Sequence, residues 1–185
     1  MLEPFVVEFD PEQHEHVTPY LAAIHASCIT HDGTVATFLP PLSDAKITSW
    51  WKARATEIGS GDRLIWLLIN KADSSEGFTG AEVMGVVMLQ MPVTETGPFR
   101  GNIEKLLVHH NFRGRGGATL LMRALESEAI KRGRTKLMLD TEAGSAAEVY
   151  LYPKLGYKKL GVMPEYGIGP TGELKDLVYF YKFLK

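Results

Sequence analysis

One glycine-rich stretch, residues 113–118, constrains the fold and chemistry of this chain more than any other part of it. It lies between a strand-like run, residues 102–108, and a helix-like run, residues 118–131. Glycines at three of four successive positions let the backbone approach a ligand closely, and the first amides of the helix supply unpaired donors and partial positive charge. Because Arg113 and Arg115 add cationic donors, the stretch predicts a site for a di-anion such as a pyrophosphate.

Two other phosphate-binding turns fit these residues less well. A P-loop needs a lysine directly after its glycines, and none stands there. A dinucleotide fingerprint needs a third glycine where Thr119 stands, and it follows a strand directly, whereas five residues separate Val108 from Gly114. Asp140 ends the next predicted strand as a ribose-binding acid would, so binding of a nicotinamide cofactor stays open. A glycine-rich connection without a ligand is a further alternative, but it leaves the flanking arginines unexplained.

The stretch resembles the acetyl-coenzyme A signature of the GNAT acyltransferase superfamily, R/Q-x-x-G-x-G/A, here Arg113-Gly114-Arg115-Gly116-Gly117-Ala118. Leu155-Gly156-Tyr157 is similar to the L-G-F/Y element of that superfamily. More narrowly, residues 139–145, with His31-Asp32-Gly33 and residues 59–66, resemble the tabtoxin-resistance acetyltransferases.

The resemblance implies a single N-acetyltransferase domain over residues 1–185, of mixed α/β and α+β class. We expect a twisted mixed sheet of about six to seven strands flanked by about four helices. The implied reaction moves an acetyl group from acetyl-CoA to a primary amine of a small acceptor that is like an amino acid, a toxin or an antibiotic. Two alternatives stay open: acetylation of a protein N-terminus or peptide, and a non-catalytic module that binds acyl-CoA.

The resemblance also implies which residues bind the cosubstrate. Backbone amides near the end of the first strand of the motif bind the thioester carbonyl, the glycine turn binds the pyrophosphate, and a residue after the next strand contacts the pantetheine arm. In GNAT folds the two strands diverge, and the arm lies in the gap. The expected cofactor-binding residues are Leu107, Val108, Arg113, Gly114, Arg115, Gly116, Gly117, Ala118 and Ser145.

The general base is less clearly marked. Many members of the superfamily carry a glutamate where this chain has Asn102, and an amide cannot take a proton. Strict alternation along the strand predicts Asn102, Glu104 and Leu106 on one face. The resemblance therefore leaves the role of base to Glu104 or to Asp140 on the neighbouring strand.

A tyrosine four residues before the glycine of L-G-F/Y implies Tyr152 as the general acid. Counting forward from Ala147 reaches Leu151 instead, as if the chain held one extra residue, and Tyr150 is a rival candidate. Ser145 is the predicted N-cap of the helix that carries them, which runs to Leu155.

Two segments are expected to form the walls of the acceptor pocket. Residues 31–41 lack either hydrophobic period and form a predicted loop, and Ser43 caps a following helix with Ile47, Trp50 and Trp51 on its apolar side. Residues 164–172 are rich in glycine and proline and form a second predicted long loop. A third loop, residues 71–80, is predicted to have a mobile tip, and residues 63–70 a strand buried on both faces.

Composition restricts the partners. The 185 residues suit one globular domain, and a formal net charge of −2 gives no field that attracts nucleic acid or an anionic membrane. We expect a small-molecule amine as the partner, and we leave a homodimer open. The single cysteine, Cys28, cannot form an internal disulfide and is expected to be a buried small hydrophobe, and no leader or apolar run of about twenty residues appears. A soluble, cytoplasmic protein is expected.

No metal site is expected. His14, His16 and His25 lie in or near the first predicted helix, but no acidic ligand set accompanies them. Solvated histidines are the simpler prediction.

Overall fold

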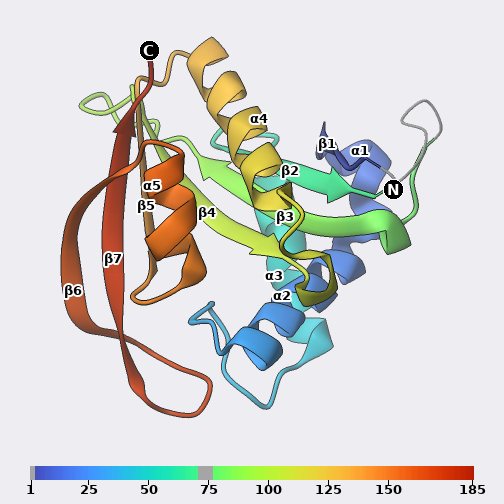
Figure 1. Cartoon of the computed structure of the whole chain (residues 1–185). Helices are drawn as coiled ribbons and strands as arrows, with labels where there is room; N and C mark the ends of the chain where they lie inside the picture. Colours follow the sequence, from blue (N-terminus) through green and yellow to red (C-terminus); the bar gives the residue numbers. More distant parts are fainter. Residues whose placement is uncertain (1–2, 71–76) are drawn as a thin grey trace.

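A computed structural model describes residues 3–70 and 77–185 as a twisted sheet with helices on both faces (Figure 1). The predicted loop tip at residues 71–76 lies outside the described residues. The strands are β1 Phe5–Glu8, β2 Arg63–Ile69, β3 Val83–Gln90, β4 Arg100–Val108, β5 Lys136–Glu142, β6 Lys158–Ile168 and β7 Leu174–Phe183. The helices are α1 Pro11–His14, α2 Thr18–Asp32, α3 Asp44–Thr56, α4 Gly117–Lys131 and α5 Tyr152–Lys154. Short 3-10 turns, η1 Glu15–Val17, η2 Gly80–Glu82 and η3 His110–Phe112, and a π-helical turn, η4 Ala147–Leu151, complete the described elements.

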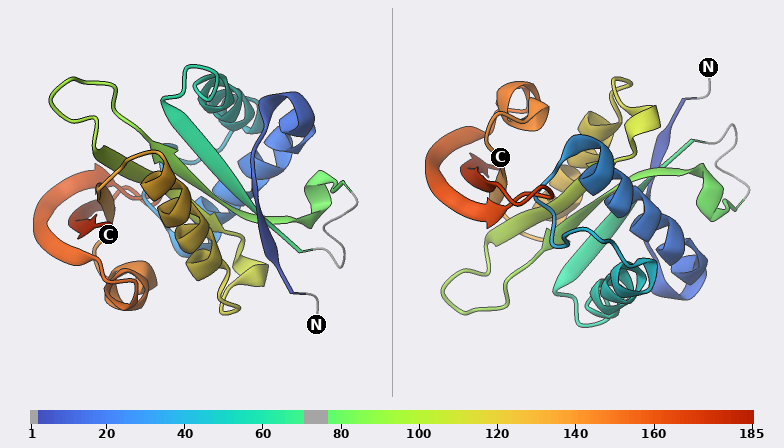
Figure 2. Two further views of the ribbon diagram at one scale, coloured as in Figure 1. Left: turned by 90° about the horizontal axis from the view of Figure 1, so that it is seen from above. Right: turned by 90° about the horizontal axis from the view of Figure 1, so that it is seen from below.

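The strand order is β1-β2-β3-β4-β5-β7-β6, and all neighbours are antiparallel except the parallel pair β4 and β5. Helix α4 covers one face of the sheet, and α2 and α3 cover the other (Figure 2). Apolar side chains of β2 and β3 therefore enter two separate cores, and every residue of β2 is buried. The predicted mixed α/β fold and the central burial of residues 63–69 are confirmed.

Strands β4 and β5 separate soon after they meet. They pair only where Arg100 to Asn102 lie opposite Lys136 to Met138. Beyond Asn102 and Met138 the two strands diverge, as the resemblance implied. Their remaining residues leave a gap in the middle of the sheet.

A β-bulge at Lys105 breaks the alternation of β4. Strands β3 and β4 pair as far as Glu104 and again from Leu107, so two residues of β4 lie opposite Val87. Lys105 itself takes a left-handed backbone conformation, with φ of 51°. Leu106 packs into the core under α4, whereas Lys105 reaches the α3 side. The prediction that Leu106 shares a face with Asn102 and Glu104 is therefore wrong, because strict alternation does not survive a bulge.

The predicted loop at residues 164–172 is also wrong over most of its length. Strand β6 continues to Ile168, and only the short connection to β7 is a turn, closed by the Gly169 amide donating to the Glu173 carbonyl at 2.7 Å. Strand β6 tolerates Pro164 and Gly167 because it is an edge strand with a bulge between Met163 and Gly167. In that bulge the Glu165 amide donates to the Asp176 carboxylate at 2.8 Å.

The α2–α3 segment confirms some details and corrects others. Ser43 caps α3 by accepting from the Lys46 amide at 3.3 Å, as predicted, and Trp51 is buried. Helix α2 extends to Asp32, beyond the predicted start of the loop. His25 is 0% exposed and donates from Nε2 to the Ala36 carbonyl at 2.8 Å, so the prediction of a solvated histidine is wrong for this residue. Burial lowers the pKa of His25 to about 4.

Two further findings concern only the described ranges. No helix there is both long enough and apolar enough to cross a membrane. No group of three or more histidine, cysteine or acidic side chains there is placed to hold a metal ion.

Candidate active site

The glycine turn leads directly into the N-terminus of α4. Gly114 and Gly116 have φ of 73° and 79°, a left-handed conformation that side chains rarely adopt, and Gly116 is the N-cap of the helix. No side chain caps this end of α4. The first amides of α4 have no partner within the helix and carry its positive dipole end, so the turn is built to bind an anion.

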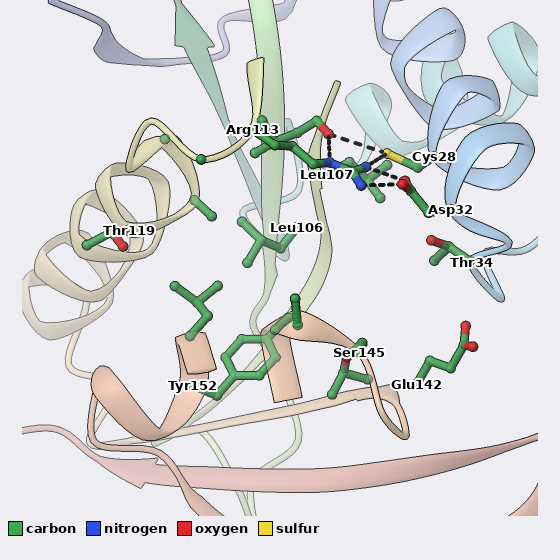
Figure 3. A pocket seen from close by; sticks show the side chains of 18 of the residues that line it. Cys28, Asp32, Thr34, Leu106, Leu107, Arg113, Thr119, Glu142, Ser145 and Tyr152 are labelled. Atoms are coloured by element: carbon green, nitrogen blue, oxygen red, sulfur yellow. Dashed lines mark hydrogen bonds and ion pairs between the residues drawn. The ribbon is translucent and has the colours of Figure 1, made fainter. Parts of the chain in front are cut away.

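Arg113 fixes this turn to the rest of the protein. Its Nε donates to the Val108 carbonyl at 2.9 Å, and both terminal nitrogens donate to the carboxylate of Asp32 at the end of α2 (Figure 3). One terminal nitrogen also contacts the sulfur of Cys28 at 3.3 Å. Cys28 is buried, as predicted, and burial raises the pKa of its thiol to about 11. The guanidinium is therefore occupied by protein partners, and its predicted contact with a pyrophosphate stays a prediction.

A cavity of about 710 Å³ opens beside the glycine turn. Eight of the nine residues predicted to bind the cofactor line it: Leu107, Val108, Arg113, Gly114, Gly116, Gly117, Ala118 and Ser145. Arg115, the ninth, instead has its guanidinium over the ring of Phe112, 5.8 Å from the centroid. The walls also include Asp32, Thr34, Leu106 and Glu142, which the sequence motif did not identify (Figure 3).

One backbone amide of β4 faces the gap between β4 and β5. The amide of His109 donates to the Met84 carbonyl of β3 at 2.9 Å. Amide directions alternate along an antiparallel strand, so Leu107 also turns its amide toward β3, and Val108 turns its amide away from β3 into the gap. Of the two amides predicted to bind a thioester carbonyl, only that of Val108 has the required direction.

The segment after β5 contains an inserted residue. Ser145 Oγ accepts from the Glu148 amide at 3.2 Å, which confirms the predicted N-cap. The helix then opens into the π-helical turn η4, which accommodates one residue more than an α-helical turn. This turn accounts for the extra residue found by counting from Ala147.

The π-helical turn separates the two candidate tyrosines. Tyr152 is 5% exposed and lines the cavity, whereas Tyr150 is 72% exposed and does not line it. Burial, and then the negative charge of Asp140, raise the pKa of Tyr152, while a hydrogen bond with Thr141 opposes the rise. The phenol is therefore protonated at neutral pH, although the raised pKa makes it a weaker acid than an ordinary tyrosine.

A second cavity, of about 590 Å³, lies along β4, β5 and β7. Its walls include Asn102, Glu104, Met138, Asp140, Leu160, Tyr179, Tyr181 and Phe183. The two predicted carboxylates thus line one cavity, but their surroundings differ.

Glu104 is held by a cation. Its carboxylate accepts from a terminal nitrogen of Arg63 at 2.7 Å, and Arg63 also donates to Glu57 at 2.5 Å. Asn102 is similarly occupied, because its amide nitrogen donates to the side chain of Gln90 at 2.7 Å.

Within the described chain, no hydrogen bond or ion pair holds the Asp140 carboxylate. Burial raises the pKa of Asp140, Lys105 opposes that rise, and Glu104 adds to it. A carboxyl with a raised pKa and no fixed partner is better suited to exchange a proton than one clamped by arginine.

The two predicted acceptor walls meet at the edge of the site. The Val35 amide in the α2–α3 connection donates to Glu142 at 3.2 Å, and Lys175 of β7 pairs with the same carboxylate at 3.1 Å. A Cβ on Gly167 of β6 would come within 2.8 Å of the Val35 side chain. The α2–α3 connection and the β6–β7 hairpin therefore close over one side of the gap, although the second wall is a strand and not the predicted loop.

Known acetyltransferases are similar in sequence to part of this chain. The family model described as Acetyltransferase (GNAT) family matches residues 44–157. Curated relatives include acetyltransferase YE1169 of Yersinia enterocolitica, 37% identical over 83 residues that make up 45% of this chain and 58% of the relative. N-alpha-acetyltransferase 30 of Schizosaccharomyces pombe is 27% identical over 52% of this chain and 64% of its own length. The chain thus matches less than two thirds of the length of each of these relatives.

Solved structures are similar over nearly the whole chain. An N-acetyltransferase from Staphylococcus aureus has a TM-score of 0.73 at 17% identity and covers 99% of both chains. The putative acetyltransferase yncA from Salmonella typhimurium, solved with its cofactor acetyl-CoA, has a TM-score of 0.71 at 17% identity and covers 98% of this chain and 94% of its own. A putative phosphinothricin N-acetyltransferase has a TM-score of 0.75 at 15% identity and covers 99% of both chains. At these identities the similarity shows the fold alone.

Proposed function

The chain belongs to the acetyltransferase (GNAT) family, and we propose that it transfers the acetyl group of acetyl-CoA to the primary amine of a small acceptor. One observation carries this proposal: the left-handed glycine turn at the start of α4 opens onto a cavity that reaches the gap between β4 and β5. One cavity thus contains both the anion-binding glycine turn and the Val108 amide, which points into the gap.

The backbone does most of the binding in this proposal. Amides from Gly114 to Ala118 bind the pyrophosphate of acetyl-CoA, and the pantetheine arm lies between β4 and β5 near Ser145. The amide of Val108 donates to the thioester oxygen, where it stabilises the negative charge that develops during attack. Arg113 acts as a positioning residue, because its contacts with Asp32 and Val108 hold the turn in place.

Asp140 is the base that we favour. An amine is mostly protonated at neutral pH, so a base must remove one proton, directly or through water, before the nitrogen attacks the thioester. Asp140 has a raised pKa and no fixed partner, whereas Arg63 occupies the carboxylate of Glu104. In this assignment Glu104 fixes β4 to β2 through Arg63.

Tyr152 is the proposed acid. It lines the cofactor cavity, and its hydroxyl, which is protonated at neutral pH, can donate a hydrogen bond and then a proton to the departing thiolate.

The closed edge of the site favours a compact acceptor. Val35, Glu142 and Gly167 meet over one side of the gap, which leaves less room for an extended chain than an open groove would. The narrower resemblance to tabtoxin-resistance acetyltransferases would also favour a small acceptor, and it stays a prediction. A protein N-terminus is the competing acceptor, in keeping with the name of the N-alpha-acetyltransferase 30 relative.

Turnover of a panel of amines tests the proposal. Thiol release from acetyl-CoA should be saturable with at least some small primary amines and much slower with short peptides that have free N-termini. Saturable turnover of peptides alone would replace the small acceptor with a protein N-terminus.

Calorimetry tests the cosubstrate separately. We expect binding of acetyl-CoA and none of NAD. Binding of acetyl-CoA without turnover of any amine or peptide would favour the non-catalytic module, and binding of NAD alone would revive the nicotinamide alternative.

A homodimer, which the sequence leaves open, is a lesser part of the proposal. The edge strand β6 exposes several apolar side chains, namely Leu160, Val162, Met163, Tyr166 and Ile168, and such an edge is available for pairing with a second copy. Light scattering coupled to gel filtration should give twice the mass of the chain, and a monomer would contradict it.

A further inference from the structure

Lys105 occupies an unusual position at the centre of the β4 bulge. Its backbone φ of 51° lies in the left-handed region, which non-glycine residues seldom adopt without a local reason. The bulge turns the lysine to the side of the sheet that carries α3 and Glu104. Its ammonium lies 5.7 Å from the centre of the Trp50 ring, on the helix that follows the predicted acceptor loop.

The ammonium has no anionic partner in the described chain. No hydrogen bond or ion pair within 4.0 Å engages it, although Glu104 and Asp140 are close enough to act on it electrostatically. Burial lowers the pKa of Lys105, which reflects the loss of water around a charge that nothing fully compensates. Three donors are therefore available in a partly dehydrated place.

The neighbouring cations differ, because each already has an acid. Arg54, which lies 5.2 Å from the same Trp50 ring, pairs with Glu57 at 2.7 Å. Arg63 pairs with both Glu57 and Glu104. Lys105 is thus the unmatched cation of this group, and it is also one of the charges that act on Asp140.

We propose that Lys105 is a specificity-determining residue that binds a carboxylate of the acceptor, so that the enzyme selects amines with a carboxylate close to the amino group, as in an α-amino acid. The inference rests on the proposed function, since the amine must lie near Asp140. The ammonium supplies a charge-assisted hydrogen bond to the carboxylate, and the Trp50 ring supplies an apolar surface beside it. An amine without a carboxylate would leave the Lys105 ammonium without an anionic partner and would gain no binding energy from it.

Paired substrates test this inference. Steady-state kinetics would compare amino acids with their α-carboxamides, which keep size and amine but lack the negative charge. Wild-type protein should favour the carboxylates by about 10- to 100-fold in kcat/KM, the range for a hydrogen bond to a charged group. Lys105→Met should reduce the preference to within about threefold, mainly by raising KM for the carboxylates.

A matched control is present on the same helix as Trp50. The ammonium of Lys46 also lies over an aromatic ring, 5.7 Å from the centre of Phe38, but on the exposed side of α3. Lys46→Met should leave the preference unchanged. Lys105→Gln serves as a second variant should the methionine disturb folding, and unchanged acetyl-CoA affinity shows that the cofactor site is intact.

Four outcomes would overturn the inference. The inference fails if wild-type protein uses carboxamides as well as carboxylates, or if Lys105→Met slows both equally. A shift of the acid limb of the pH profile with unchanged preference would make Lys105 a modulator of Asp140 and not a substrate contact. Absence of turnover with every amine would defeat the proposed function itself, and the inference with it.

Discussion

The two cavities along β4 and β5 are built in different ways. The cavity beside α4 takes most of its predicted contacts from consecutive residues of one turn, and its donors are mainly backbone amides. The cavity beyond it takes its charged groups from separate strands, and its chemistry lies in side chains such as Glu104 and Asp140. A backbone site depends on conformation, so it is sensitive to φ; a side-chain site depends on charge, so it is sensitive to its neighbours.

This difference predicts a separation of kinetic effects. Substitutions in the glycine turn should change affinity for acetyl-CoA and leave the response to the amine nearly unchanged. Substitutions among the charged groups of the second cavity should change turnover or the KM of the amine and leave acetyl-CoA affinity nearly unchanged.

The largest effect is expected at Asp140. Asp140→Asn should lower kcat by about two to four decades, because the amide cannot accept the proton of the ammonium. Calorimetric affinity for acetyl-CoA should stay near that of the wild type. Glu104→Gln is the matched control and should cost much less turnover, since Arg63 keeps its second partner, Glu57. The reverse order of losses would move the base to Glu104.

The pH profile provides an independent check on the same residue. Asp140 must be ionised to act as a base, so activity falls as the pH drops through its pKa. Because burial raises that pKa, the acid limb should lie above the usual aspartate value of about 4. Lys105 favours the ionised form, so Lys105→Met should move the limb to still higher pH. An acid limb at or below about 4 would contradict the assignment.

A smaller effect, in affinity only, is expected at Gly116. Gly116→Asp places a carboxylate among donors that await a pyrophosphate and forces a side chain into a left-handed conformation, which costs about 1 to 2 kcal/mol. Affinity for acetyl-CoA should fall by about two decades. Gly116→Ala separates the two causes, because nothing lies within 4 Å of its Cβ and only the strain remains. Equal losses in both variants would mean that no anion binds there.

The same contrast explains what the sequence could predict. The glycine turn, the N-cap at Ser145 and the burial of β2 are recorded in neighbouring residues, and all three were predicted. The bulge at Lys105 is different, because it depends on how β4 pairs with Val87 of β3. Nothing in the order of residues 102–108 marks where alternation fails.

Long-range contacts account for the other errors. Pro164 and Gly167 suggested a loop, but at the edge of a sheet neither residue prevents a strand, and a bulge absorbs them. His25 resembled a surface histidine in the sequence, yet it packs among Phe38, Trp50 and Trp51 from residues further along the chain. The acceptor side was therefore harder to predict because its neighbours are distant in sequence.

The inserted residue after β5 connects the two kinds of site. A count from Ala147 and a count back from Gly156 disagreed by one position, and the π-helical turn η4 contains the difference. In an unbroken α-helix, a single inserted residue would rotate everything after it by about 100° around the helix axis, since an α-helix has about 3.6 residues per turn. The π-helical turn takes up the residue without that rotation, and Tyr152, not Tyr150, lines the cavity.

The smallest predicted effect concerns these tyrosines. Tyr152→Phe should slow turnover by about tenfold, at the low end for a lost acid, because a thiol with a pKa near about 8.5 leaves readily without full protonation. Tyr150→Phe should have no effect, since that ring is 72% exposed and lies outside the cavity. Affinity for acetyl-CoA should survive in both variants. A larger loss in Tyr150→Phe would show that the π-helical turn changes register when the substrates bind, and that the tyrosine facing the thiolate is chosen then.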